Sequence, residues 1–152
     1  ITDDGTVACR GRTLMTGYAG EPEMTARVLR DDTVYTADLA SIDDQGRLRL
    51  MGRNDDVINI GGYKVAPTEV EDAAMAMEGV KDCICICDTS PVMGNRLKLL
   101  VVTDDDAMLD KRRLARHIAE RLEGYKVPQL YEQVKAIQRT YNGKLDRKHY
   151  RR

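Results

Sequence analysis

Two stretches of the chain repeat apolar residues at the spacing of one helix face. In the first stretch these residues are Val70, Ala73, Ala74 and Met77, and in the second they are Leu114, Ala115, Ile118 and Leu122. Residues three, four, seven or eight positions apart lie on one side of a helix, so each stretch predicts a helix with a buried face. Pro67 and Asp110 suit the two helix starts, and Gly79 and Gly124 are expected to end the helices.

Short runs of β-branched and aliphatic residues, bounded by turn-forming residues, predict strands elsewhere in the chain. These runs cover residues 7–9, 34–36, 47–50, 57–60, 83–87, 97–102 and 131–137. A short helix is predicted over residues 24–29, and the acidic run 104–106 is expected to end the strand before it. Beyond Ile137 the sequence is polar, and no further element is predicted there.

Composition limits the classes of protein to which this chain can belong. Its 152 residues suffice for one domain, or for a small domain with a piece of another, and 42% hydrophobic residues suffice for a core. The formal net charge of -1 provides no overall positive charge that would attract nucleic acid or a membrane surface. No apolar run approaches the roughly 20 residues of a membrane span, and no signal peptide is visible. The first residue is Ile1 rather than Met, so we expect the chain to start inside a longer protein.

Three of the four cysteines, Cys83, Cys85 and Cys87, alternate along one predicted strand. On a strand their thiols share one face. A soft-metal or redox site is one interpretation of this pattern. We prefer a buried strand that uses cysteine as a small apolar residue, because no histidine or fourth ligand lies nearby in the sequence. We therefore predict no metal site, and reduced thiols fit a cytoplasmic location.

Residues 52–71 form the stretch with the clearest succession of local signals. A polar turn precedes the apolar run 57–60, and Gly61 and Gly62 then permit a tight bend or a close approach of the backbone to a ligand. A helix follows from Pro67. The pattern predicts a turn, a strand, a glycine loop and a helix. The glycines lack the spacing and the lysine of a phosphate-binding loop, which excludes that interpretation.

Taken together, residues 52–71 resemble the core motif of the adenylate-forming enzymes, which include acyl-CoA synthetases, peptide-synthetase adenylation domains and luciferases. Residues 36–39, Thr-Ala-Asp-Leu, resemble the upstream Thr-Gly-Asp-Leu motif of that family, with Ala37 in place of its glycine. Residues 142–147, Asn-Gly-Lys-Leu-Asp-Arg, resemble the Asn-Gly-Lys-x-Asp-Arg motif near its C-terminus. The three motifs occur in the family's order and span most of the chain.

The resemblance implies an α+β fold with two parts. Residues 52–152 would form the small C-terminal domain, with a short, mostly antiparallel sheet and flanking helices. Residues 1–51 would be the β-rich end of a large N-terminal domain. The implied reaction has two steps: a carboxylate attacks the α-phosphate of ATP with Mg²⁺ and releases pyrophosphate, and the thiol of CoA then captures the acyl-AMP.

The resemblance also implies roles for three charged residues. In the family, the lysine at the place of Lys144 bridges the substrate carboxylate and the α-phosphate, where one cation offsets the charge of two anions. Asp38 would hold the ribose hydroxyls of ATP, and Arg53 would contact phosphate or ribose oxygens. Without the resemblance, these residues are an exposed lysine, a turn aspartate and half of a surface ion pair.

Asp55 corresponds to the family's hinge, about which the domains swing between an adenylate-forming and a thioester-forming arrangement. A hinge needs backbone rotation rather than a particular side chain, so an ordinary turn residue is equally compatible with this position. Gly61 and Gly62 correspond to the loop beside the tunnel through which the pantetheine of CoA reaches the adenylate. A side chain in that loop would obstruct the tunnel.

The sequence therefore predicts the C-terminal portion of an ATP-dependent acyl-CoA synthetase. We expect this portion to be inactive alone, because it shows no phosphate loop, adenine motif or acyl pocket. A non-catalytic docking module and a peptide-synthetase adenylation domain stay open as alternatives, as do the acid, the acceptor thiol and the oligomeric state. The basic tail 147–152 is weak evidence for nucleic-acid binding, because the charge elsewhere is balanced and no groove-reading motif accompanies it.

Overall fold

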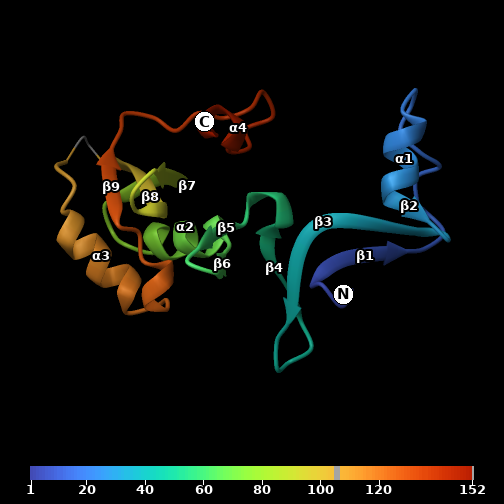
Figure 1. The fold of residues 1–152 in the computed structure, drawn as a ribbon, viewed down its shortest axis with the longest axis horizontal. Coiled ribbons are helices and arrows are strands. Elements are labelled where there is room, and N and C mark those ends of the chain that lie inside the picture. The colour runs from blue at the N-terminus through green and yellow to red at the C-terminus, as the bar shows by residue number, and fades with distance from the viewer. Residues whose placement is uncertain (105–106, 152) are drawn as a thin grey trace. The chain divides into compact units, whose positions relative to one another are not determined.

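The computed structural model describes residues 1–104 and 107–151 of the chain. It contains two compact units, Ile1–Asp55 and Asp56–Arg152. Figure 1 labels the helices and strands of both units in chain order. None of the helices in the described ranges is long and apolar enough to cross a membrane. The domain boundary predicted between residues 51 and 52 concerns the parent protein and stays a prediction.

The first unit is an antiparallel sheet built around one long strand. Its strands are β1 (Thr6–Arg10), β2 (Leu29–Arg30), β3 (Thr33–Ile42) and β4 (Leu48–Arg53), and its helix is α1 (Pro22–Val28). β3 pairs with each of the other three strands. The short helix and the three strands predicted here are confirmed, but β3 extends to Ile42, six residues beyond its predicted end at residue 36, and β2 was not predicted. Only Thr6 and Ala40 of this unit are buried, so the sheet has almost no core of its own.

The second unit combines a small hairpin, a three-stranded sheet and three helices. Its strands are β5 (Ile58–Ile60), β6 (Tyr63–Val65), β7 (Val80–Ser90), β8 (Gly94–Thr103) and β9 (Leu130–Gln133), and its helices are α2 (Pro67–Met75), α3 (Lys111–Ala119) and α4 (Arg147–Tyr150). β5 pairs with β6 and β7 pairs with β8 in antiparallel fashion, whereas β9 joins β8 in parallel. Antiparallel pairs therefore predominate, and the predicted α+β class is confirmed.

Both faces of the three-stranded sheet are covered, by different parts of the chain (Figure 1). Helices α2 and α3 pack on one face, where the fully buried side chains include Val70, Leu97, Leu99, Leu114 and Ile118. On the other face, Ile137, Leu145 and Tyr150 of the C-terminal segment pack with Ile84 and Leu100. Burial of each such aliphatic side chain stabilises the fold by roughly 1.5–3 kcal/mol. Apolar packing therefore holds both the helices and the C-terminal segment against the sheet.

Both main helices end earlier than the sequence predicts. α2 stops at Met75, ahead of Gly79, which adopts φ +90° immediately before β7. α3 stops at Ala119, and Gly124 begins a 3₁₀ turn instead of closing the helix. The helix starts are confirmed, and the side chain of Asp110 accepts two backbone N–H bonds at the start of α3. α2 starts at Pro67 without a side-chain cap, so the two starts use different local signals, a proline and a capping aspartate.

The end of the chain has more structure than its polar sequence predicts. β9 stops at Gln133, so the strand predicted to reach Ile137 is too long. The chain instead buries Ile137 against the sheet and finishes in α4, where no element was predicted. β8 ends at Thr103, directly before the acidic run that was expected to end it, and residues 105–106 of that run lie outside the described residues.

The cysteines of β7 are divided between the core and the surface. Cys83 and Cys85 are buried beneath α2, whereas Cys87 is exposed. Burial raises the pKa of Cys83 to about 12 and also raises the pKa of Cys85, so both remain protonated thiols. The use of cysteine as a small apolar residue is confirmed for these two and is wrong for Cys87. The part of the chain that the structure describes holds no group of three or more metal-binding side chains.

Candidate functional site

Lys144 lies in a short hairpin formed by the C-terminal segment, here called the Lys144 hairpin (residues 139–145), directly after the turn at residues 141–143. Arg139 and Leu145 form an antiparallel bridge at its base. The Thr140 N–H donates to the carbonyl of Lys144 at 2.8 Å, and the Gly143 N–H donates to the carbonyl of Thr140 at 2.9 Å. Gly143 has φ +81°, which glycine adopts without strain. The side chain of Lys144 is exposed, so the hairpin presents a cation to solvent.

Arginines anchor the chain on both sides of this hairpin. On one side, Arg139 donates to the two carboxylate oxygens of Asp82 at 2.7 and 2.8 Å, and to the carbonyl of Gly143 at 3.0 Å. On the other side, Arg147 donates to the two carboxylate oxygens of Glu71 at 2.7 and 2.8 Å. The second pair is better shielded, because its side chains are 16% and 8% exposed against 44% and 25% for the first.

Glu71 stands at the centre of a group of charges, here called the Glu71 cluster (Asp56, Glu71, Arg147 and Arg151). Its Oε1 also accepts the N–H of Cys85 at 2.8 Å. Nε of Arg147 lies 3.3 Å from Asp56, and Arg151 lies 2.5 Å from the other oxygen of Asp56. Burial raises the pKa of Glu71, and the guanidinium of Arg147 opposes that rise. Two carboxylates face two guanidinium groups, so the cluster carries no formal net charge.

Gly61 and Gly62 are the two central residues of the turn between β5 and β6. Ile60 pairs with Tyr63 across the turn, and the glycines have φ +57° and +95°, the positive values that favoured two-residue hairpin turns require. The Gly62 N–H donates to Oδ1 of Asn59 at 2.8 Å. The predicted order of elements is therefore wrong at this point, because strand β6 separates the glycines from helix α2.

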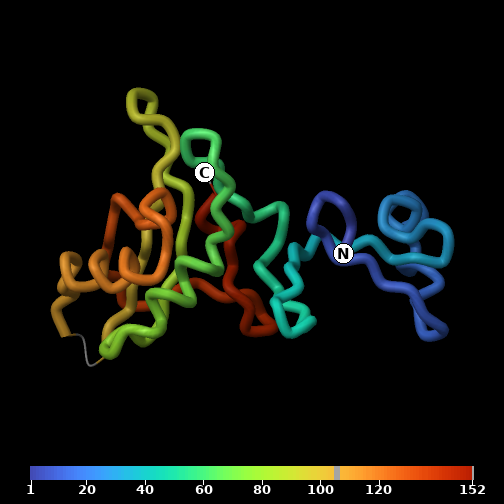
Figure 2. Tube along the Cα trace, turned by 90° about the horizontal axis from the view of Figure 1, so that it is seen from below, coloured from blue at the N-terminus to red at the C-terminus, as the bar shows by residue number. Residues whose placement is uncertain are grey.

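Uncharged contacts hold the glycine turn in place. Asn95 of β8 donates to the carbonyl of Asn59 at 3.1 Å, and Figure 2 shows the β5–β6 hairpin beside the longer β7–β8 hairpin. Tyr63 stacks on Tyr125, with ring centroids 4.5 Å apart. A Cβ added at either glycine would meet no atom within 4 Å. The turn therefore presents bare backbone, with open space beside it within this unit.

Asp38 and Arg53 are paired across β3 and β4 in the first unit. Nη1 of Arg53 lies 3.8 Å from Asp38, and Nη2 lies 3.5 Å from Asp55. The side chains of Asp38 and Arg53 are 46% and 56% exposed, so their ion pair contributes only about 0–1 kcal/mol and leaves both groups accessible. The N–H of Asp38 donates to the hydroxyl of Thr36 at 3.1 Å, which orients this part of the motif.

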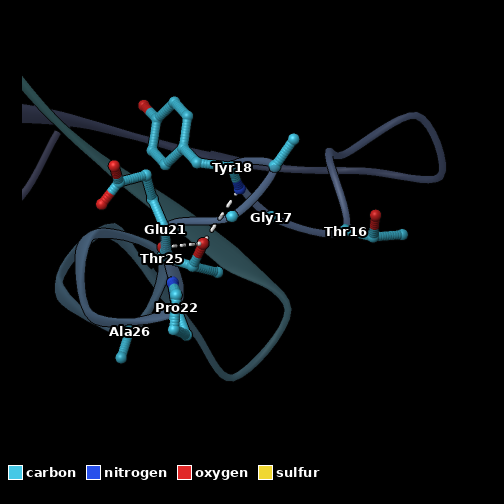
Figure 3. A pocket seen from close by; sticks show the side chains of 9 residues that line it. Thr16, Gly17, Tyr18, Glu21, Pro22, Thr25 and Ala26 are labelled. Atoms are coloured by element: carbon cyan, nitrogen blue, oxygen red, sulfur yellow. Dashed lines mark hydrogen bonds between the residues drawn. The ribbon is translucent and has the colours of Figure 1, made fainter.

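A shallow hollow of about 580 Å³ lies beside α1 in the first unit. Figure 3 shows Thr25 at its centre, where the hydroxyl accepts the Tyr18 N–H and donates to the Glu21 carbonyl, both at 2.9 Å. A Cβ added at Gly17 would lie 3.0 Å from Thr25. The residues that line the hollow include one carboxylate and no cation. This arrangement fixes the turn before α1 and offers no site for a phosphate.

The sequence of this chain matches a known protein family. The sequence model of one family, described as the AMP-binding enzyme C-terminal domain, matches residues 69–144. This chain belongs to that family. The match to the AMP-binding enzyme C-terminal domain lies entirely within the unit Asp56–Arg152 and extends from α2 to Lys144.

Relatives of this AMP-binding enzyme C-terminal domain align with nearly the whole chain. A long-chain-fatty-acid–CoA ligase of Bacillus subtilis is 34% identical over 146 residues, which is 96% of this chain and 26% of the relative. A feruloyl-CoA synthase of Amycolatopsis sp is 35% identical over 143 residues, 94% of this chain and 29% of the relative. The solved structure of an amide bond synthetase from Marinactinospora thermotolerans has a TM-score of 0.88 at 30% identity, over 96% of this chain and 30% of that one. The chain spans less than a third of the length of these relatives.

The residues predicted to be functional are divided between the two units. Lys144, Gly61 and Gly62 lie in the unit Asp56–Arg152, with Lys144 at the end of the range that the family model matches and the two glycines ahead of that range, whereas Asp38, Arg53 and Asp55 lie in the first unit. The roles assigned to all six stay predictions. Sequence reasoning missed the arginine anchors of the Lys144 hairpin, because their partners lie 57 and 76 positions away in the chain and each is individually an ordinary charged residue.

Proposed function

We propose that this chain is the C-terminal portion of a cytoplasmic, ATP-dependent acyl-CoA synthetase. The observation that carries the proposal is the exposed ammonium of Lys144, held in a hairpin that is anchored on both sides. A single fixed cation suits a reaction between two anions. The names of the two curated relatives, a CoA ligase and a CoA synthase, point to the same chemistry.

In the first step, an oxygen of the substrate carboxylate attacks the α-phosphorus of ATP. A carbon–oxygen–phosphorus linkage forms, and the bond from the α-phosphorus to pyrophosphate breaks. Lys144 would lie where the carboxylate meets the phosphate and would stabilise the negative charge that builds up in the transition state. We propose that Mg²⁺ accompanies the phosphates of ATP and offsets their charge in this step.

Asp38 and Arg53 would bind the nucleotide in this scheme. A carboxylate has two acceptor oxygens and matches two neighbouring hydroxyls, as on a ribose. The weak ion pair with Arg53, at 3.8 Å, is easily replaced by stronger hydrogen bonds to a ligand. The contact between Nη2 of Arg53 and Asp55, at 3.5 Å, is equally exposed and long, so a ribose or phosphate oxygen could replace it at the guanidinium fork.

In the second step, the sulfur of CoA attacks the carbonyl carbon of the acyl-AMP, and AMP leaves. The turn at Gly61 and Gly62 would border the path of the pantetheine arm. Its bare backbone and the open space beside it fit that role. We propose that the backbone rotation that exchanges the two steps occurs at Asp55, which lies at the end of the first unit.

An amine is a second candidate for the acceptor, because the solved relative is named an amide bond synthetase. The alternatives make distinct predictions. An adenylation domain of a peptide synthetase would transfer its acyl group to a carrier protein rather than to CoA. A docking module without catalysis would show no dependence of any reaction on Lys144.

The direct test uses the full-length protein that carries this segment. It is assayed for acid-dependent exchange of labelled pyrophosphate into ATP with aliphatic and aromatic acids, and then for transfer of the acyl group to CoA or to an amine. We expect exchange with at least one acid, followed by CoA thioester formation. The 152-residue chain alone should catalyse neither step. Exchange by the chain alone, or an absence of exchange by the full-length protein with every acid, would contradict the proposal.

A further inference from the structure

The Glu71 cluster connects the Lys144 hairpin to the interior of its unit. Arg147 follows Lys144 closely in the chain, and its guanidinium is bound from two sides, by Glu71 through Nη1 and Nη2 and by Asp56 through Nε. Glu71 belongs to α2, which packs in the main core. A planar guanidinium held along two edges has little freedom to rotate or shift. The backbone beside Arg147 is therefore fixed relative to the sheet and to α2.

We infer that Arg147 is a positioning residue for Lys144, and that the buried pair with Glu71 sets where the ammonium of Lys144 stands. This inference rests on the proposed function of Lys144. Arg147 contacts no reacting atom in this scheme. Its effect passes through the short segment between the two residues, and a displacement of about 1 Å in a reacting group can cost about 10²-fold in rate.

The apolar contacts of the C-terminal segment act separately from this pair. Leu145 and Tyr150 pack against the sheet, and the hydroxyl of Tyr150 accepts the N–H of Gln138 at 2.9 Å. These contacts keep the segment on the sheet even when Arg147 is replaced. Loss of the ion pair should therefore loosen the Lys144 hairpin without releasing the whole segment.

The test needs a variant that removes the pair without leaving a buried charge. Arg147→Met alone would leave the carboxylate of Glu71 buried and unpaired, which destabilises a fold strongly. In the double variant Glu71→Gln with Arg147→Met, the amide oxygen of glutamine can still accept the N–H of Cys85, which Glu71 accepts at 2.8 Å. Arg112→Met, at an exposed position of α3, is the matched control for the loss of an arginine.

The first measurement is amide hydrogen exchange on the 152-residue chain, which does not require the chain to be catalytically active. In the double variant, the amides of Thr140 and Gly143 should exchange about tenfold faster or more, because opening the hairpin no longer requires breaking the buried pair. The amides of β8 should keep the protection that they have in the parent chain. Arg112→Met should leave both sets unchanged. Unchanged exchange at Thr140 and Gly143 in a folded double variant would overturn the inference.

The second readout is the split between kcat and KM in the full-length protein. The double variant should lower kcat for pyrophosphate exchange about 10- to 100-fold, with little change in KM for ATP or the acid. Synthetic acyl-AMP should still react with CoA at the parent rate. A purely structural role predicts instead that both half-reactions fall together with the amount of folded protein, and that result would overturn the inference.

Lys144→Ala distinguishes failure of this inference from failure of the proposed function. If Lys144→Ala keeps full exchange activity, the proposed function itself is wrong. If Lys144→Ala loses exchange while the double variant keeps both the parent kcat and the parent amide protection, the proposed function stands and only the positioning role of Arg147 is wrong.

Discussion

The glycine turn of β5–β6 and the Lys144 hairpin both contain glycine with positive φ, but they expose different groups. In each, a glycine with positive φ donates its N–H to an oxygen of the same hairpin, from Gly62 to Asn59 and from Gly143 to Thr140. The first turn presents bare backbone and the second presents a cation. In the proposed scheme the first turn keeps a space empty and the second places a charge, and the turns differ in backbone, because Gly61 and Gly62 both have positive φ whereas Gly143 alone does in the Lys144 hairpin.

The contacts that hold the two turns also differ, because those of the glycine turn are uncharged and those of the Lys144 hairpin are ion pairs. Stacked tyrosine rings and an asparagine hydrogen bond hold the glycine turn, whereas ion pairs of Arg139 with Asp82 and of Arg147 with Glu71 hold the Lys144 hairpin. In the proposed scheme the glycine turn only shapes a path, for which uncharged anchors suffice. A turn that places a charge between two anions gains more from rigid, paired anchors, because preorganised charge is worth more than charge that must be moved into place.

The largest effect is expected for Lys144→Ala in the full-length protein. Pyrophosphate exchange should fall about 10²–10³-fold, as when one preorganised electrostatic contact is lost, while synthetic acyl-AMP should still react with CoA. Lys144→Arg should also be poor, because a planar fork does not replace a compact ammonium. Lys148→Ala removes another exposed lysine of the same segment and serves as the control. Full ATP-dependent activity in Lys144→Ala would leave this residue an ordinary surface lysine.

Gly62→Leu should impair the opposite half-reaction. Thioester formation should be blocked and pyrophosphate exchange largely kept, because the side chain would occupy the path proposed for pantetheine. Any side chain at φ +95° is also strained, by roughly 1–3 kcal/mol. Gly62→Ala carries the same backbone strain with little bulk, so the difference between the leucine and alanine variants isolates the effect of volume. Equal CoA turnover in both would show that Gly62 is only a turn residue.

Asp55→Pro should change the ratio of the two half-reactions rather than abolish one of them. Proline fixes φ near -65° and disfavours helical backbone at the residue before it, and Asp55 lies in the 3₁₀ turn Asn54–Asp56. Only one of the two domain arrangements is expected to accept that restriction. Asp55→Asn changes the charge without restricting the backbone and should keep the parent ratio. Equal losses in both half-reactions of a folded Asp55→Pro variant would count against the hinge.

The smallest effect is expected for Gly61→Asn. Gly61 has φ +57°, in the left-handed region that asparagine tolerates better than other residues with a side chain. Thermal unfolding of the 152-residue chain should show a loss of about 1 kcal/mol or less. Gly61→Val, with a β-branched side chain at the same φ, should lose more stability. Equal melting temperatures for the two variants would mean that the turn relaxes out of its positive-φ conformation.

The sequence predicted best those features that depend on neighbouring residues. Asp110 accepts the N–H bonds expected of a helix cap, and Pro67 starts α2. Strand β6 also has a local signal, because Gly61 and Gly62 separate two strand-like runs by two residues, which is the signature of a hairpin.

Features that depend on distant residues were not predictable in the same way. The second face of the sheet is covered by Ile137, Leu145 and Tyr150 from a polar segment, whose few apolar residues show no helical or strand periodicity. The pair of Glu71 and Arg147 joins positions 76 residues apart, and neither residue type signals burial by itself. For Lys144, the sequence indicated the residue and its turn, but the anchors that hold the hairpin emerged only from the fold.

The buried thiols of β7 give this chain an internal reporter of its own opening. Tryptophan is absent, so the usual fluorescence signal of unfolding is not available. Cys9 and Cys87 are exposed, whereas Cys83 and Cys85 are buried. A brief pulse of an alkylating reagent should therefore label the first two in the native state and all four once the unit Asp56–Arg152 has opened. Counting added labels by mass would thus measure how often the core beneath α2 is exposed to solvent, without a dye or an engineered residue.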